Sequence, residues 1–148
     1  MNTIREILRM RPSLLTPNQS VRIHLLHNHS VFIENIGSGP QGYPAIAVGS
    51  YLPEDSRLQH VPEIHFEIKS ARDIAIELMP FYLRDDTAGL ILRAALFDGI
   101  TEIDTAIVRR IQNFAWAWDM ELDARGILVA YIAGAAEERL ARTRIHIH

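Results

Sequence analysis

The sequence predicts an α+β fold in which an antiparallel sheet comes first and helices follow. Before Gly99 the apolar residues mostly alternate with polar ones, and after Gly99 they recur every three or four positions. A period of two is typical of half-buried strands, and a period near 3.6 is typical of amphipathic helices. We therefore expect about five to six strands, a short N-terminal helix and two C-terminal helices packed on one face of the sheet. Residues 1–148 are expected to form a single domain.

Composition favours a soluble globular protein, because 48% of the 148 residues are apolar and 22% are charged. The net charge of −3 disfavours a nucleic-acid partner, since such proteins usually present a basic face. The absence of cysteine excludes disulfides, thiolate zinc sites and cysteine nucleophiles. The sequence has no apolar run long enough to cross a membrane and no signal-peptide pattern, so we expect a cytoplasmic protein without membrane contact.

The first half of the chain predicts one helix and then strands. Residues 2–10 place apolar side chains at helical spacing, with Asn2 or Thr3 as the N-cap, and Pro12 ends the helix. Strands are expected over residues 21–26, 31–36, 43–52, 63–68, 74–83 and 90–97. A short helix is the alternative for the last of these segments, which is rich in leucine and alanine. Residues 53–60 are expected to form a polar loop. The clearest alternation lies in residues 63–68. One face of this strand carries the apolar side chains of Ile64, Phe66 and Ile68, and the other carries the polar side chains of Glu63, His65 and Glu67.

Two helices are expected after Gly99, the first opened by a capping box of Thr101 and Asp104. One apolar stripe of this helix should face the sheet: Ile103, Ile107, Ile111, Phe114, Trp118 and Leu122. The last helix, over about residues 127–142, should point five side chains inward: Leu128, Tyr131, Ile132, Ala135 and Leu140. Trp116 lies off the first stripe together with Val108 and Ala115, and we expect the last helix to cover these three. If it does not, they form an exposed apolar patch for a partner.

Two segments resemble a family of small uncharacterised bacterial domains that are often encoded on plasmids and other mobile elements. Residues 62–66 (PEIHF) and 80–89 (PFYLRDDTAG) are similar to its proline-acid-x-x-Phe strand and its Pro-x-Tyr-x-x-(Asn/Asp)-Asp-x-x-Gly hairpin. Residues 114–126 (FAWAWDMELDARG) are similar to its Phe-Ala-x-x-Trp-(x)₃-Leu-x-x-Gln-Gly helix end, with Arg125 in the place of Gln. The resemblance covers about residues 43–126 and implies no activity or functional residues.

One set of residues resembles the motif of the Pro-Asp…(Asp/Glu)-x-Lys nuclease superfamily. Asp55 follows Pro53 at a short distance, and Glu67 and Lys69 come later on the clearest strand. In that superfamily two carboxylates hold Mg²⁺ and the lysine orients the attacking water. A period of two places Glu67 and Lys69 on one face, and Lys69 is the only lysine among the 15 basic residues. The resemblance implies a catalytic set of Asp55, Glu67 and Lys69.

The histidines offer a second chemistry, because three or four imidazole or carboxylate ligands that converge can bind a divalent metal. The candidate ligands are His24 and His29 near the first hairpin and His65 on the clearest strand. Exposed polar positions on the solvent face of a sheet are the alternative explanation for the same residues.

The sequence favours a domain that works through protein contacts without catalysis, in accessory or mobile-element biology. The apolar C-terminal helices suggest that a homodimer or another protein partner binds there. A Mg²⁺-dependent nuclease is the alternative function, and the sequence indicates no particular cofactor.

Overall fold

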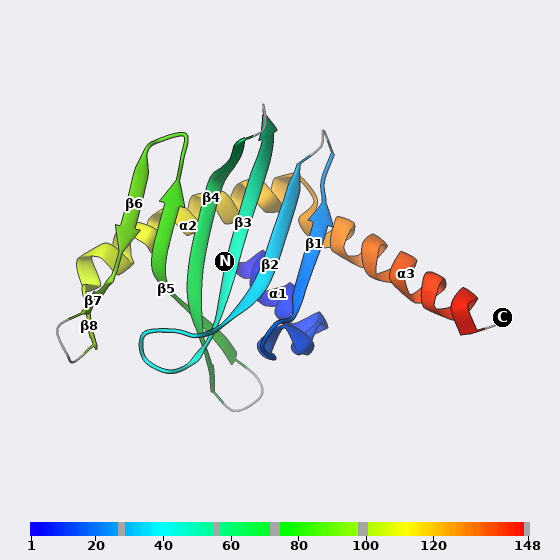
Figure 1. Cartoon of the computed structure of the whole chain (residues 1–148), viewed down its shortest axis with the longest axis horizontal. Coiled ribbons are helices and arrows are strands. Elements are labelled where there is room, and N and C mark those ends of the chain that lie inside the picture. The colour runs from blue at the N-terminus through cyan, green and yellow to red at the C-terminus, as the bar shows by residue number, and fades with distance from the viewer. Residues whose placement is uncertain (27–28, 55–56, 72–74, 98–100, 147–148) are drawn as a thin grey trace.

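The computed structural model describes residues 1–26, 29–54, 57–71, 75–97 and 101–146. Its main element is an antiparallel sheet in which each strand pairs with its neighbour in the sequence (Figure 1). The six described strands of this sheet are β1 (Ser20–His24), β2 (Ser30–Ser38), β3 (Pro44–Glu54), β4 (Arg57–Ala71), β5 (Ala75–Asp85) and β6 (Leu90–Arg93). Two short strands, β7 (Ala95–Phe97) and β8 (Thr101–Ile103), pair separately.

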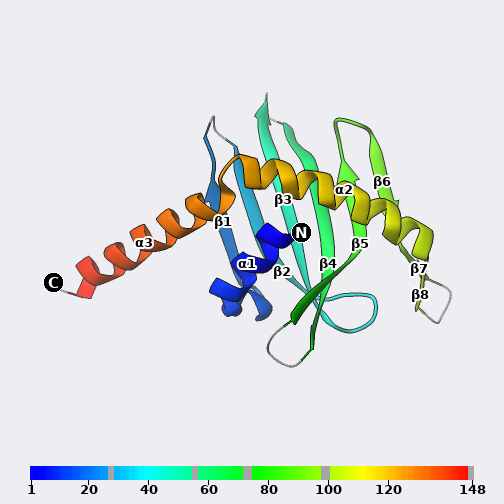
Figure 2. The ribbon, with the colours of Figure 1, turned by 180° about the vertical axis from the view of Figure 1, so that it is seen from behind.

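The helices are α1 (Asn2–Met10), α2 (Thr105–Ala124) and α3 (Ile127–His146), with a 3₁₀ turn, η1 (Pro12–Leu15), after α1. Both α1 and α2 lie across one face of the sheet, whereas α3 runs outward past β1 (Figure 2). The predicted fold class is therefore confirmed: an antiparallel sheet, a short N-terminal helix and two C-terminal helices.

The face under α1 and α2, called here the covered face, holds the core. Alternate residues of neighbouring strands pair across it, as Val48 does with Ile64 and Ile64 with Leu83. The fully buried large side chains come from the sheet, α1, η1 and both C-terminal helices: Ile4, Ile7, Leu8, Leu14, Val31, Ile33, Ile46, Ile64, Phe66, Leu83, Ile111 and Ile127. The opposite face, called the open face, carries the intervening residues and is covered by no described helix (Figure 1).

The prediction of a loop over residues 53–60 is wrong for the described residues of this segment, because β3 extends to Glu54 and β4 begins at Arg57. Leu52 pairs with Gln59, Pro53 with Leu58 and Glu54 with Arg57. Backbone pairing in an antiparallel ladder satisfies the amide and carbonyl groups whatever the side chains are. A polar stretch with a proline was therefore a poor signal for the end of these strands.

The predicted start of α2 is also wrong, because the N-cap lies three residues later than expected. Thr101 belongs to β8, and α2 begins at Thr105 with Asp104 as its N-cap. The Asp104 carboxylate accepts hydrogen bonds from the amides of Ala106 (3.0 Å) and Ile107 (3.2 Å). Aspartate caps a helix as well as threonine does, so a strand could take the residues before it.

A distant residue caps α1 in place of the predicted Asn2 or Thr3 side chain. Its N-cap position is Met1, which makes no side-chain capping bond. The carboxylate of Asp119 on α2 accepts hydrogen bonds from the Asn2 amide (2.9 Å), the Thr3 amide (3.0 Å) and the Thr3 hydroxyl. Asp119 is 9% exposed, so α2 supplies a buried anion to the positive end of α1.

Several predicted contacts of the last helix are absent. Tyr131 is buried and Leu128 and Ala135 are half-buried, as expected, but Ile132 (55%) and Leu140 (60%) are exposed. Trp116 is 66% exposed, so α3 does not cover it. Val108 and Ala115 are buried in the core beside the α2 stripe. The cause is the direction of α3, which leaves the body after its first turns (Figure 2).

Candidate functional site

The structure places two of the predicted nuclease residues on one face. Glu67 and Lys69 both lie on the open face of β4, where Glu67 pairs with Met79 and Lys69 with Glu77 of β5. The third residue, Asp55, lies outside the described residues.

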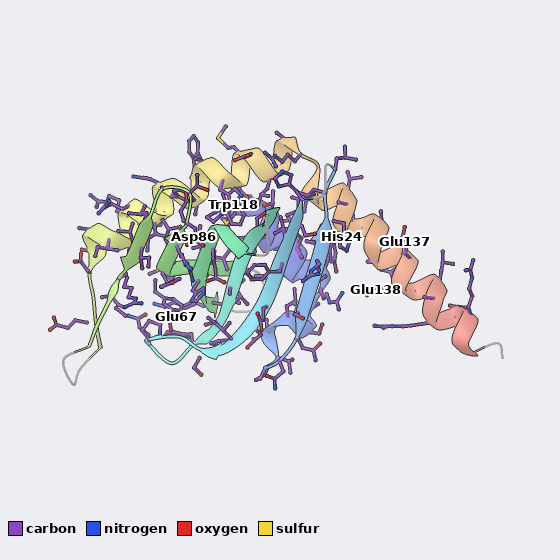
Figure 3. All side chains as sticks on the ribbon, turned by 45° about the horizontal axis from the view of Figure 1, so that its top comes forward. His24, Glu67, Asp86, Trp118, Glu137 and Glu138 are labelled. Carbon is purple, nitrogen blue, oxygen red and sulfur yellow. The ribbon has the colours of Figure 1, made fainter. Side chains whose placement is uncertain are left out.

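Glu67 is held by the loop between β2 and β3. It is 2% exposed, and its Oε2 accepts hydrogen bonds from the backbone amides of Gln41 (3.0 Å) and Tyr43 (3.2 Å). Gly39 packs so closely on the Glu67 side chain that a Cβ at position 39 would overlap it. The loop therefore folds over Glu67, as Figure 3 shows beside the labelled residue. Its carboxylate acts as an anchor for this loop.

Lys69 has an aromatic neighbour from the same loop. Its Nζ lies 5.1 Å from the centre of the Tyr43 ring, within the range of a cation–π contact. Both candidate residues thus have structural partners, and the catalytic assignment of Asp55, Glu67 and Lys69 stays a prediction.

Of the three candidate metal ligands, His24 and His29 flank the hairpin between β1 and β2, whereas His65 lies far from both. His24 on β1 is 3.2 Å from the Ser30 hydroxyl, measured from Nδ1, and His29 precedes β2. His65 lies on β4, three strand steps from β1, which amounts to about 14 Å at the usual strand spacing. Within the described ranges, no three histidine or carboxylate side chains gather into a possible metal site. The histidine site stays a prediction.

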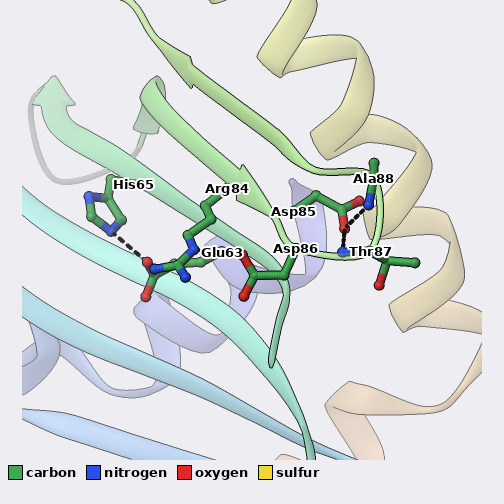
Figure 4. Close-up of polar contacts among 7 residues, drawn as sticks. All are labelled: Glu63, His65, Arg84, Asp85, Asp86, Thr87 and Ala88. Atoms are coloured by element: carbon green, nitrogen blue, oxygen red, sulfur yellow. Dashed lines mark hydrogen bonds and ion pairs between the residues drawn. The ribbon is translucent and has the colours of Figure 1, made fainter. Parts of the chain in front are cut away.

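His65 instead belongs to a polar network on the open face that sequence reasoning missed (Figure 4). Its Nε2 lies 3.4 Å from Oε2 of Glu63, and its ring stacks on Tyr82 with centroids 4.4 Å apart. On the next strand Arg84 donates from Nε to Asp86 at 2.7 Å, and this hydrogen bond raises the pKa of Arg84 above its ordinary value.

Register explains how the network forms. Glu63 pairs across the ladder with Arg84, and His65 pairs with Tyr82. The alternation of residues 63–68 did indicate that Glu63 and His65 share a face, but their partners depend on the β4–β5 register, which no local pattern encodes. Opposite charges lie side by side in this network, so it favours neither a polyanion nor a polycation.

The C-terminal helices present large apolar side chains to solvent. Five of them are more than half exposed: Trp116 (66%), Met120 (56%), Val129 (73%), Ile132 (55%) and Leu140 (60%). Three of these lie on α3 at positions that, with Ala136, form one stripe along the helix. This α3 stripe, defined as Val129, Ile132, Ala136 and Leu140, lies opposite the buried Ile127 and Tyr131. The sequence indicated that α3 makes apolar contacts, but it did not indicate which side of the helix remains exposed to solvent.

Comparison with known proteins identifies one family. Residues 2–128 match the family described as domain of unknown function DUF6908. No curated protein and no solved structure matches the chain. The match ends two residues into α3, so the α3 stripe lies beyond the matched part. None of the helices in the described ranges is long and apolar enough to cross a membrane.

Proposed function

Starting from the premise that this chain belongs to the family of the domain of unknown function DUF6908, we propose that it is a binding module that acts through protein contacts of its C-terminal helices. Membership confirms the expectation of an uncharacterised domain family. The observation that carries the proposal is the α3 stripe, whose Val129 is 73% exposed on a helix that projects from the body (Figure 1). Contiguous exposed apolar side chains on a small protein mark interaction surfaces.

The occupant of the α3 stripe is a second copy of this chain. Glu137 and Arg144 are seven residues apart, so they flank the stripe on the same side with opposite charges. Two α3 helices that pack antiparallel around Leu140 set Glu137 of one copy beside Arg144 of the other, and two-fold symmetry repeats the pair. This self-complementary charge order supports a homodimer over an unrelated partner.

Substitution at the centre of the stripe tests the homodimer. Leu140→Glu places a charge in the proposed interface, whereas Ala141→Glu adds the same charge at the next exposed position, off the stripe. Light scattering and sedimentation velocity should give a dimer for the wild type and for Ala141→Glu. Leu140→Glu should weaken the dimer by more than about tenfold, which corresponds to about 1.4 kcal/mol. A monomeric wild type, or an equal response to both substitutions, contradicts the proposal.

The setting of this module rests on the resemblance alone. We place it in the bacterial cytoplasm, in accessory biology associated with mobile elements. Genes that encode chains with the same segments should then lie beside plasmid replication or transfer genes more often than beside housekeeping genes. An even distribution would count against this setting.

A Mg²⁺-dependent nuclease using Asp55, Glu67 and Lys69 is the second candidate. The observation in its favour is that Glu67 and Lys69 share the open face of β4. The amides of Gln41 and Tyr43 that bind Glu67 favour an anchoring role instead. Cleavage of plasmid DNA with Mg²⁺ or Mn²⁺ by the wild type, lost in Lys69→Ala, would establish the nuclease. No cleavage, or equal cleavage by both proteins, would end it.

A further inference from the structure

A cavity of about 380 Å³ lies between the covered face and the C-terminal half of α2, away from the α3 stripe and the open face. Its volume falls within the range of small-molecule sites, about 300–1,000 Å³. The walls are mostly apolar and come from distant parts of the chain: Leu25, Val31, Val61, Pro62, Phe114, Ala117, Trp118 and Leu122. Trp118, labelled in Figure 3, belongs to the buried stripe of α2.

Two polar groups that line this cavity have no hydrogen-bond partner among the described residues. Ser50 and Trp118 line it and are each only 7% exposed. Neither the Ser50 hydroxyl nor the Trp118 indole N–H forms a hydrogen bond within the described ranges. The only fully enclosed side-chain polar atom without a partner in the same ranges is Nε of Arg5, so both groups reach open space. Both groups are therefore free to form hydrogen bonds with a ligand that enters the cavity.

The charged residues that line the cavity determine which sign of charge a ligand should carry. Arg125 is paired with Glu121 at 2.7 Å. The Asp85 carboxylate accepts backbone hydrogen bonds from Thr87 (3.0 Å) and Ala88 (3.3 Å), and no cationic side chain among the described residues pairs with it (Figure 4). With the His29 imidazole, which also lines the cavity, counted as neutral, the charge left uncompensated by a side chain is negative and favours a cation.

From these three observations we propose that the cavity binds a small aromatic amine. The ring lies among Phe114, Trp118 and Pro62, where aromatic and apolar walls favour it. A ring hydroxyl or N–H bonds to Ser50, and the ammonium group lies at Asp85.

Three matched probes test the proposal on the full chain: tyramine, its acidic analogue 4-hydroxyphenylacetate and the neutral p-cresol. The chain has two tryptophans, so nitrogen–proton NMR spectra contain two indole signals, and Trp116→Phe assigns them. Tyramine should shift the Trp118 signal saturably and leave that of the exposed Trp116 in place. It should bind about fivefold more tightly than the acid, the effect of one partly screened charge pair near 1 kcal/mol.

Two substitutions separate the charge from the cavity. Asp85→Asn keeps an oxygen to accept from Thr87 and Ala88, so the turn should persist while the preference for the amine disappears. Ala117→Leu fills the cavity from an exposed position and should abolish binding of all three probes, with a melting curve to verify folding. The proposal is overturned by the absence of saturation with tyramine, by equal or tighter binding of the acid, by an equal shift of Trp116, or by unchanged binding to folded Ala117→Leu.

Discussion

Helices α2 and α3 are both 20 residues long and follow one another across Arg125 and Gly126, yet they behave differently. The α2 helix lies along the covered face and buries a continuous stripe that includes Ile111, Trp118 and Leu122. In α3 the buried side chains are Ile127 and Tyr131 in the first turns, and the described residues from 136 to 144 are exposed. Apolar content alone does not bury a helix, because burial requires another surface opposite the apolar side.

The family match also distinguishes the two helices. It covers all of α2 and ends at residue 128, near the start of α3. The matched part therefore contains all of α2, whereas most of α3 lies beyond it. The apolar stripe of α3 is exposed and that of α2 is buried, and this contrast supports a partner at α3.

The largest expected effect compares one isoleucine on each helix. Ile111→Ala removes a fully buried side chain and should lower the free energy of unfolding by about 3–4 kcal/mol, because it leaves a cavity in the core. Ile132→Ala removes an exposed side chain and should change it by less than about 0.5 kcal/mol in dilute protein, where copies do not associate. Urea denaturation measures both, and similar losses would show that α3 is packed as firmly as α2.

The next effect concerns the polar contact that ties α2 to α1. Asp119→Ala leaves the amides of Asn2 and Thr3 without their acceptor and should cost about 2–3 kcal/mol. The matched control is Asp123→Ala, four residues further on α2 at an exposed position, which should cost less than about 0.5 kcal/mol. Hydrogen exchange should show the α1 amides losing protection only in Asp119→Ala. Equal stability of the two variants would mean that α1 is capped in another way.

The smallest effect is expected from shortening α3. A chain that ends after Ala136 keeps Ile127 and Tyr131 but loses an exposed segment and the contact of Arg11 with Glu138 at 3.4 Å. Its free energy of unfolding should stay within about 1 kcal/mol of that of the full chain, because such exposed ion pairs contribute little. The same truncation should abolish the homodimer. A dimer that survives it would place the interface on another surface.

Sequence reasoning recovered the fold because the alternation of residues such as Ile64 and Phe66 is a local property of the strand. It recovered less of the candidate sites. Placing Glu67 and Lys69 on one face needed only period two, but the amides that bind Glu67 come from a loop 24 and 26 residues earlier in the chain. The pairs Glu63–Arg84 and His65–Tyr82 required the register of two strands. Such contacts depend on how distant segments meet, and composition or spacing does not specify that.

By itself the sequence determined the order of sheet and helices, the two faces of β4 and three buried positions of α2, Ile111, Trp118 and Leu122. It missed the buried Val108 and Ala115, and it counted Ile103 of β8 as part of the helix. Only the tertiary structure decided that Asp119 caps α1, that the α3 stripe meets solvent, and that Ser50 and Trp118 share a cavity. The physical reason is that periodicity arises from backbone geometry within one element. The burial of a side chain and its hydrogen-bond partners depend on which other segments of the fold pack against that element.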